Sequence, residues 1–271
     1  MLREVAETVA PGWERWRAFI EAAVAPVRDW MITELAPRPG DTLLELAAGA
    51  GDTGFEAAAI AGPRGRLIST DLSPAMVDVA RRRAAELGLE GVDHRVVDAE
   101  RISLDDAAVD GVICRFGVML MADPAAALAE ARRVLRPGGR AVLAVWGPPD
   151  RNPWLTILAR ALVERGHMPP PEPGSPNPFS MGSAGATQGL LEGAGFTSVR
   201  TAEVPVLFPY RDLDHYLRVA GDTAGPAVIV LRGLSERERG ALAGHLGEAF
   251  APFAAGPGYA LPGVALAAVA S

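Results

Sequence analysis

One glycine-rich turn constrains the fold of this chain more than any other stretch. It spans Gly49 to Gly54 and follows a short apolar run, residues 43–48, in which Glu45 is the only acid. Such a run is typical of a strand buried on both faces of a parallel sheet. Gly49 and Gly51 allow positive φ and let a ligand approach the backbone. The turn therefore predicts a nucleotide-type site where a parallel strand ends and a helix begins.

Two cofactors fit this turn. Its letters form G-x-G-x-x-G, and Asp71 follows at about the 20-residue spacing of a ribose-binding acid, which suits NAD. Glu45, inside the strand, favours S-adenosylmethionine instead, because a carboxylate can reach a cationic ligand group but repels a pyrophosphate. An NAD-dependent oxidoreductase is therefore the alternative from another enzyme class.

The rest of the chain alternates strands and helices with short turns between them. This order predicts an α/β fold with a doubly wound, seven-stranded, mostly parallel sheet and a helical cap. The expected strands are 42–47, 66–71, 93–97, 109–114, 140–146, 196–208 and 264–269. The expected helices are 53–61, one from Ser73-Pro74 onward, 124–135, 153–165, 184–194 and a mostly helical stretch over 211–253.

Before the sheet, residues 12–35 read as a helix that Pro26 divides in two. Trp13, Trp16 and Phe19 recur at helical spacing and share one face. This face either covers the cofactor as a lid or packs on the main domain, and the two interpretations stay open.

The domain organisation follows from these elements. We expect an N-terminal helical lid over 1–36 and a main domain over 37–271. Within the latter, the loop and helix at 147–183 and the helical insert at 211–253 form a substrate cap. Residues 168–178 hold six prolines and predict a surface loop.

Composition excludes several function classes. The net charge is −7 and the pI about 5.2, which argues against binding nucleic acid, because that needs a basic face. Cys114 is the only cysteine and lies in an apolar run, so we expect a core residue and no metal site. No apolar span of 18 residues and no signal-like N-terminus occur, so we expect a cytoplasmic protein without a membrane span. A homodimer is compatible with the sequence.

With these elements placed, the chain resembles the class I S-adenosylmethionine-dependent methyltransferases, most closely the small-molecule ubiquinone/menaquinone-biosynthesis type. Four segments carry the resemblance, in order: Glu45 to Gly51, Thr70 to Met76, Val97 to Glu100 and Arg133 to Gly139. The resemblance covers 40–146 well and 184–271 in outline. The family loop often begins with glycine where this chain has Ala47.

The resemblance implies how the cofactor would be held. Asp71 would accept hydrogen bonds from both ribose hydroxyls, and Leu72 and Met76 would sandwich the adenine. Asp98, with the Ala99 backbone, would read the adenine amino edge.

The methionine end would lie nearer the first and fourth strands. Glu45 and the Ala47 carbonyl would orient the ammonium group, while Gly49 and Gly51 permit close approach. Arg115 and Phe116 would flank the methionine tail, chiefly through their backbone. S-adenosyl-L-homocysteine would be the product.

Methyl transfer from a sulfonium is an in-line displacement in which positioning supplies much of the rate. A hydroxyl acceptor would also need a general base. The candidates are His167, His215 and the acids Asp212 and Asp214; a surface or core role is the alternative for each histidine.

Aromatic side chains predict a small-molecule acceptor that is apolar or aromatic. Trp146 is the strongest candidate because it ends the fifth strand, although core packing is the alternative. The expected acceptor-lining residues are Trp13, Trp16, Trp146, Trp154, Phe179, Met181 and Tyr210. A third interpretation keeps S-adenosylmethionine binding without methyl transfer.

Overall fold

The computed structural model of the chain describes residues 2–170 and 177–271. Residues 171–176, the centre of the expected proline-rich loop, lie outside the described residues. The strands are β1 (Thr42–Glu45), β2 (Arg66–Asp71), β3 (Val92–Val96), β4 (Val109–Arg115), β5 (Leu135–Trp146), β6 (Val199–Tyr210), β7 (Ala254–Ala255) and β8 (Gly258–Ala270).

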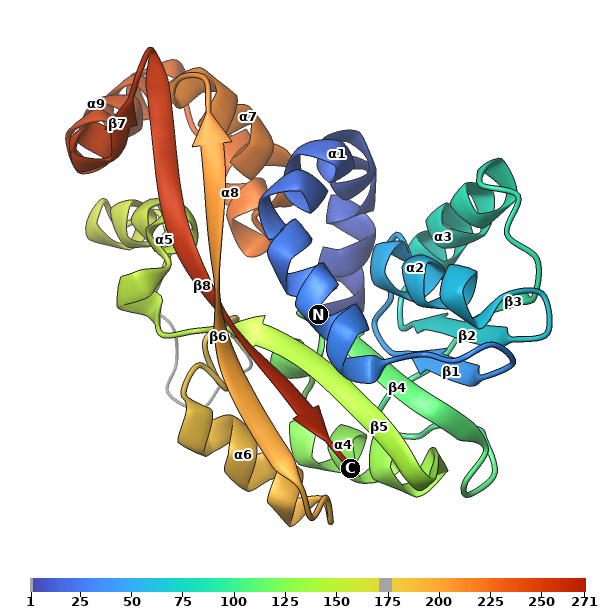
Figure 1. Ribbon diagram of the computed structural model, residues 1–271. Helices are drawn as coiled ribbons and strands as arrows, with labels where there is room; N and C mark the ends of the chain where they lie inside the picture. Colours follow the sequence, from blue (N-terminus) through green and yellow to red (C-terminus); the bar gives the residue numbers. More distant parts are fainter. Residues whose placement is uncertain (1, 171–176) are drawn as a thin grey trace.

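Seven of these strands form one twisted sheet in the order β3-β2-β1-β4-β5-β8-β6 (Figure 1), and the short β7 pairs with β8 beside it. Neighbours from β3 to β5 pair in parallel, whereas β8 is antiparallel to both β5 and β6. The predicted seven-stranded, mostly parallel sheet is thus confirmed.

Helices cover both faces of the sheet and one end (Figure 1). Helices α1 (Leu2–Leu35), α2 (Asp52–Ala61) and α3 (Pro74–Glu86) pack together on one face, and α4 (Pro124–Val134) and α6 (Ala184–Gly193) pack on the other. A cap at one end consists of α5 (Pro153–Glu164), α7 (Leu213–Thr223), α8 (Pro226–Gly233) and α9 (Glu236–Phe250). Short 3₁₀ turns lie at Val118–Leu120, Pro149–Arg151 and Ala251–Phe253.

The starts of α3 and α4 are fixed by side-chain caps. The Ser73 hydroxyl accepts a hydrogen bond from Met76 N–H at the start of α3, and the Asp123 carboxylate accepts one from Ala126 N–H at the start of α4. Each cap is followed by proline at the first helical position, where its missing N–H costs nothing. The expected cap at Ser235 is confirmed as a full capping box with Glu238.

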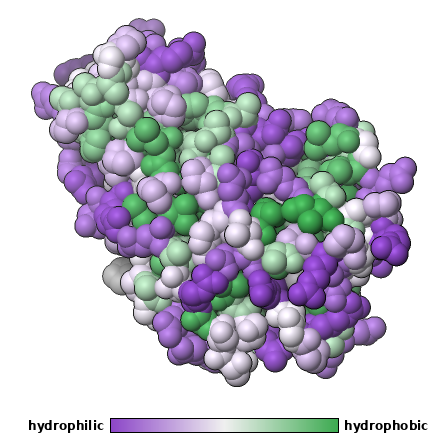
Figure 2. All heavy atoms as spheres, viewed as in Figure 1, coloured by the Kyte–Doolittle hydropathy of each residue, from purple (hydrophilic) through white to green (hydrophobic). Residues whose placement is uncertain are grey.

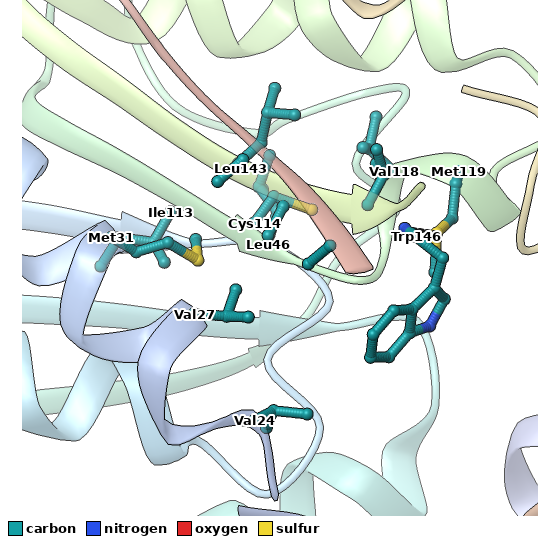
Figure 3. Close-up of a cluster of buried hydrophobic side chains, with 14 of the residues drawn as sticks. Val24, Val27, Met31, Leu46, Ile113, Cys114, Val118, Met119, Leu143 and Trp146 are labelled. Atoms are coloured by element: carbon teal, nitrogen blue, oxygen red, sulfur yellow. Dashed lines mark hydrogen bonds between the residues drawn. The ribbon is translucent and has the colours of Figure 1, made fainter. Parts of the chain in front are cut away.

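Helix α1 runs unbroken through Pro26, so the predicted division is wrong. An interior proline costs a helix about 3 kcal/mol. Its neighbours offset this cost, because Val24, Val27 and Met31 are at most 1% exposed. Figure 3 shows Val27 and Met31 pointing from α1 toward the sheet, with Met31 near Ile113 of β4. Tertiary burial therefore overrides the local break signal.

The last strand, β8, is longer than predicted and begins at Gly258 instead of 264, whereas β6 is shifted from the predicted 196–208 to Val199–Tyr210. They pair from Val199 with Ala270 to Tyr210 with Tyr259, whereas β8 pairs with β5 only over residues 265–270. The outer half of this β6–β8 ribbon thus leaves the sheet and carries the cap. Strand β5 also begins earlier than expected, at Leu135, with a register shift against β4.

The visible surface is mostly hydrophilic. Figure 2 shows hydrophobic residues in separate groups among hydrophilic ones. Among the described helices, none is long and apolar enough to cross a membrane.

Candidate functional site

The carboxyl ends of four neighbouring strands gather all the predicted cofactor residues at one edge of the sheet. Strands β3, β2, β1 and β4 are consecutive in the sheet and parallel, so the segments that follow them lie side by side. Those segments contain Glu45, Ala47, Gly49, Gly51, Asp71, Leu72, Met76, Asp98, Ala99, Arg115 and Phe116.

The glycine loop between β1 and α2 is held by its backbone. Ala48 N–H donates to the Thr70 carbonyl at 2.9 Å, and Gly51 N–H donates to the Ala48 carbonyl at 2.9 Å. Gly49 and Gly51 have φ of 55° and 83°, the left-handed region that favours glycine. A Cβ built on Gly49 would meet no atom within 4 Å, so the loop faces open space there.

Asp71 fastens this loop to the end of β2. One carboxylate oxygen accepts from Gly49 N–H and the other from Ser73 N–H, each at 2.9 Å. Burial raises the pKa of Asp71, against these backbone hydrogen bonds. Each oxygen keeps a further lone pair, so the carboxylate can still accept from two adjacent hydroxyls.

Glu45 lies beneath the first turn of α2. It is 3% exposed, and its Oε1 accepts from Gly54 N–H at 2.8 Å. Its Oε2 is buried without a hydrogen-bond partner in the described part of the chain. Burial raises the pKa of Glu45 to about 8. A buried, unpaired carboxylate oxygen fits a cationic ligand group nearby, whose charge would oppose this shift.

Ala47 stands where related loops often have glycine, and its side chain is accommodated by Gly117, which follows the neighbouring strand β4. Ala47 adopts φ of 50° although it carries a side chain. A Cβ built on Gly117 would lie 2.4 Å from the Ala47 Cβ, so only glycine at 117 leaves room for this methyl group. No local pattern marks Gly117, because the contact joins two separate loops.

Helices α1 and α3 each supply an arginine that contacts the glycine loop region. Neither arginine was predicted from the sequence as a site residue. The Asp52 carboxylate accepts from Arg17 at 3.0 Å and from Arg83 at 2.7 Å. Arg83 also donates to the Ala50 carbonyl. Arg115 directs its guanidinium to Glu21 of α1, at 3.0 and 2.5 Å, which leaves its backbone at the sheet edge.

The residues predicted around the adenine differ in exposure. Leu72 is 42% exposed, and Asp98 is exposed with one carboxylate oxygen accepting from Glu100 N–H at 3.0 Å. Met76 and Ala99 are both 8% exposed. Leu72 and Asp98 can therefore contact a ligand directly, while the other two form its backing.

A chain of rings leads from this edge toward the cap. Phe116 stacks on Trp146 with ring centres 4.0 Å apart, Trp146 contacts Trp154 at 4.8 Å, and Trp154 stacks on Phe208 at 4.1 Å. The backbone N–H of Trp146 also approaches the Met119 sulfur (Figure 3). The rings continue through Tyr216 and Phe250 to Tyr259. We call eight of the connected rings the aromatic cluster: Phe116, Trp146, Trp154, Phe208, Tyr210, Phe19, Trp16 and His215.

The structure brings four of the seven predicted acceptor residues into this cluster: Trp16, Trp146, Trp154 and Tyr210. Trp13 is 38% exposed on α1, and Met181 is 1% exposed within the core. Phe179 is partly buried against the core, in the segment joined to Met119 by the Ser180 hydroxyl.

The two candidate histidines lie in different places. His215 is 6% exposed inside the cluster, and its Nδ1 accepts from Arg211 N–H at 3.2 Å. Burial and nearby arginines lower its pKa. In the neutral ring the proton therefore lies on Nε2, which can donate a hydrogen bond to an acceptor but cannot remove its proton. His167 follows α5 and faces Glu238 at the start of α9.

The sheet order, the glycine loop after the first strand and the acid after the second are features of a nucleotide-binding α/β fold. Residues 45–143 match the family model of a methyltransferase domain. Over this part, the chain resembles the S-adenosylmethionine-dependent methyltransferases.

Similar proteins agree with this class. The ubiquinone/menaquinone biosynthesis C-methyltransferase UbiE of Acidiphilium cryptum is 40% identical over 143 residues, which are 51% of this chain and 56% of that protein. The structure of a SAM-dependent methyltransferase from Aquifex aeolicus matches with a TM-score of 0.51 at 22% identity, covering 65% of this chain and 83% of that one. The YcgJ protein of Bacillus subtilis matches with a TM-score of 0.62 at 20% identity, covering 90% and 96%. The chain spans between 25% and 56% of the length of the curated relatives it matches.

Proposed function

We propose that this protein transfers a methyl group from S-adenosylmethionine to a small apolar or aromatic molecule. The observation that carries the proposal is the tie between Asp71 and the glycine loop, which leaves a carboxylate with free lone pairs beside open space over Gly49. The unpaired Oε2 of Glu45 supports a cationic ligand over a pyrophosphate. The residues present therefore fit the cofactor.

Each part of the cofactor has a proposed holder. Asp71 would bind the ribose hydroxyls, Leu72 and Met76 the adenine faces, and Asp98 with the Ala99 backbone the adenine edge. The methionine end would lie between the Ala47 carbonyl, Glu45 and the backbone of Arg115 and Phe116, over Gly49 and Gly51. When bound, S-adenosylmethionine supplies an electrophilic methyl group.

The acceptor would lie against the aromatic cluster. Trp146 stands next to Phe116, so it joins the cofactor edge to the ring-lined side of the cap. Flat rings favour an aromatic acceptor, which they can stack and hold in line with the methyl group. A bond would form from the acceptor atom to the methyl carbon as the carbon–sulfur bond breaks, and the acceptor's proton would go to solvent.

The N-terminal segment 1–36 would act as the lid, and 147–183 with 211–253 as the substrate cap of the domain 37–271. His215 is the better placed histidine, as a hydrogen-bond donor that orients the acceptor. We propose a cytoplasmic location, and the net charge of −7 supports an acceptor other than nucleic acid. A homodimer stays a prediction.

Calorimetric titration tests the cofactor. We expect tight binding of S-adenosylhomocysteine, weak or no binding of NAD, and a large loss with Asp71→Asn. The 2′-deoxy analogue of S-adenosylhomocysteine sharpens the test, because it should bind the wild type more weakly but lose little more in Asp71→Asn. Asp41→Asn, at the opposite edge of the sheet, is the matched control.

Radiolabelled methyl transfer to a panel of small aromatic acceptors then tests the reaction. Quinols methylated at carbon come first, because UbiE of Acidiphilium cryptum carries that activity in its name. Binding of NAD alone would restore the oxidoreductase alternative. Tight S-adenosylhomocysteine binding with no transfer to any acceptor would favour a role without methylation.

A further inference from the structure

A recess is lined in part by Trp16, which also belongs to the aromatic cluster. It has a volume of about 530 Å³ and lies between the N-terminal half of α1 and helices α7, α8 and α9. We call it the arginine groove. It is lined by Arg15, Trp16, Leu217, Arg218, Gly221, Asp222, Leu231, Arg232, Arg239 and Leu242.

The groove is positively charged in a chain that is negative overall. Four arginines and one aspartate line it, whereas the whole chain carries −7. The Asp222 carboxylate is already engaged, because Arg15 and the Trp16 indole N–H both donate to it at 2.8 Å. Among the described residues, Arg15 is the only one of the four arginines with a carboxylate partner. Within the described part of the chain, the other three guanidinium groups therefore have no carboxylate partner.

One of these charges is held in place by the fold. Arg239 donates from Nε to the Leu234 carbonyl at 2.9 Å and from Nη2 to the Arg232 carbonyl at 3.2 Å. Carbonyl oxygens fix a guanidinium without cancelling its charge. A cation that is fixed in advance loses little side-chain entropy when an anion binds.

The floor between the arginines is apolar. Leu217, Leu231 and Leu242 belong to three different helices and face the same recess, together with the Trp16 ring. A purely inorganic anion would leave these surfaces wet, and a neutral lipid would leave the arginines unpaired. The lining fits a ligand that has both an apolar body and an anionic end.

Helix α1 connects the groove to the methyl-transfer site. Trp16 lines the groove and also contacts His215 in the aromatic cluster, with ring centres 5.4 Å apart. The next residue, Arg17, donates to Asp52 at the glycine loop. One turn of α1 therefore contacts the groove, the aromatic cluster and the cofactor loop.

We propose that the arginine groove binds the phosphate or carboxylate end of an amphipathic organic anion, and that this anion is the methyl acceptor. The second clause rests on the proposed function. The acceptor's charged end would pair with Arg218, Arg232 and Arg239, while its apolar body passes Trp16 toward the aromatic cluster. In this arrangement the arginine groove binds the acceptor's charged end, and the aromatic cluster binds the ring that receives the methyl group.

Binding can be measured without any methyl transfer. Decyl phosphate, below its micelle concentration, is titrated calorimetrically into the full chain with S-adenosylhomocysteine present; decanol and inorganic phosphate are the matched probes. We expect decyl phosphate to bind at least tenfold more tightly than either. The double variant Arg218→Gln/Arg232→Gln should weaken it about tenfold, since each exposed charge pair contributes modestly.

The control Arg38→Gln/Arg64→Gln removes two exposed arginines outside the groove and should leave decyl phosphate binding unchanged. S-adenosylhomocysteine is titrated into every variant, so failure of the groove is told apart from failure of the cofactor site. Equal loss in both double variants would overturn the proposal, as would equal binding of decyl phosphate and decanol. Binding to phosphatidylglycerol vesicles through the same arginines, without saturable binding of decyl phosphate, would overturn it in favour of a membrane surface.

Discussion

The contact between Ala47 and Gly117 predicts a rescue that can be measured. In Gly117→Ala the new Cβ would lie 2.4 Å from the Ala47 Cβ and 3.2 Å from the Cys114 sulfur. Carbon atoms pack at about 3.5 to 4.0 Å, so the first contact is too short by more than 1 Å. Both atoms are Cβ atoms, which no rotamer change can move. Backbone conformation adds no cost, because Gly117 has φ of −98° and ψ of −49°.

We therefore expect Gly117→Ala to lower the free energy of unfolding by about 1–3 kcal/mol, the range for overpacking a core. Ala47→Gly removes the methyl group and relieves the left-handed φ of 50°, so this single change should be close to neutral or mildly stabilising. In the double variant the overlap is gone, and stability should return to within about 0.5 kcal/mol of the wild type.

Urea denaturation of the four proteins measures this cycle, and thermal unfolding checks it at about 2–4 °C per kcal/mol. The coupling between the two sites should be about as large as the loss in Gly117→Ala. If the double variant is as unstable as Gly117→Ala alone, the Ala47 methyl group is not what demands glycine at 117.

Three further predictions concern the site. Burial raises the pKa of Glu45 from 4.5 to about 8. Between these pH values the folded protein holds a proton that the unfolded chain has lost. The free energy of unfolding therefore falls with rising pH, by up to about 1.4 kcal/mol per pH unit. Glu45→Gln should remove that fall, being more stable than the wild type at pH 9 but not at pH 4.5; parallel urea curves would contradict this. Arg83→Met should weaken S-adenosylhomocysteine binding about tenfold, because the Ala50 carbonyl loses its donor and Asp52 keeps only Arg17; the control Arg81→Met should not weaken it. Trp146→Phe should raise the acceptor KM without changing S-adenosylhomocysteine affinity; an unchanged KM would remove this ring from the acceptor site.

Most of the cofactor half of the fold could be predicted because its signals are local. The glycine turn, the acid after the second strand and the Ser73-Pro74 cap each lie within a few residues of the structure they specify. The carboxyl ends of parallel strands then meet at one edge for topological reasons. The positions of the cofactor residues along this edge could be predicted from the order of their strands in the sequence.

Several prolines lie inside elements, where the fold overrides their local effect. Pro26 does not break α1, because its neighbours are buried against the sheet. Pro205 and Pro209 lie within β6, which ends the sheet and so needs no donor on its outer side. Pro262 lies in the part of β8 that extends beyond β5. Only Pro26 was interpreted as a break; the predicted strand 196–208 already contained Pro205, and the predicted last strand began at 264, beyond Pro262.

The contacts made by α1 could not be predicted, because they depend on where a distant helix docks. Arg17, Glu21 and Arg83 carry no motif, and their partners are 35, 94 and 31 residues away along the chain. The same holds for the arginine groove, whose lining comes from four helices. Local sequence patterns predict the residues of one loop but not the residues of distant helices that contact it.

The unbroken β6–β8 ribbon determines which side of the proposed active site can open. The cap grows from the same two strands that complete the sheet, with no hinge between them, so it cannot swing away as a separate lobe. The C-terminal half of α1 is buried against the sheet, whereas its N-terminal half is also held by side-chain pairs such as Arg17 with Asp52 and Arg15 with Asp222. Ion pairs at the surface weaken with added salt. If the protein transfers a methyl group as proposed, the rate at which product leaves should therefore rise with ionic strength, with the N-terminal half of α1 as the gate and the ribbon as its fixed frame.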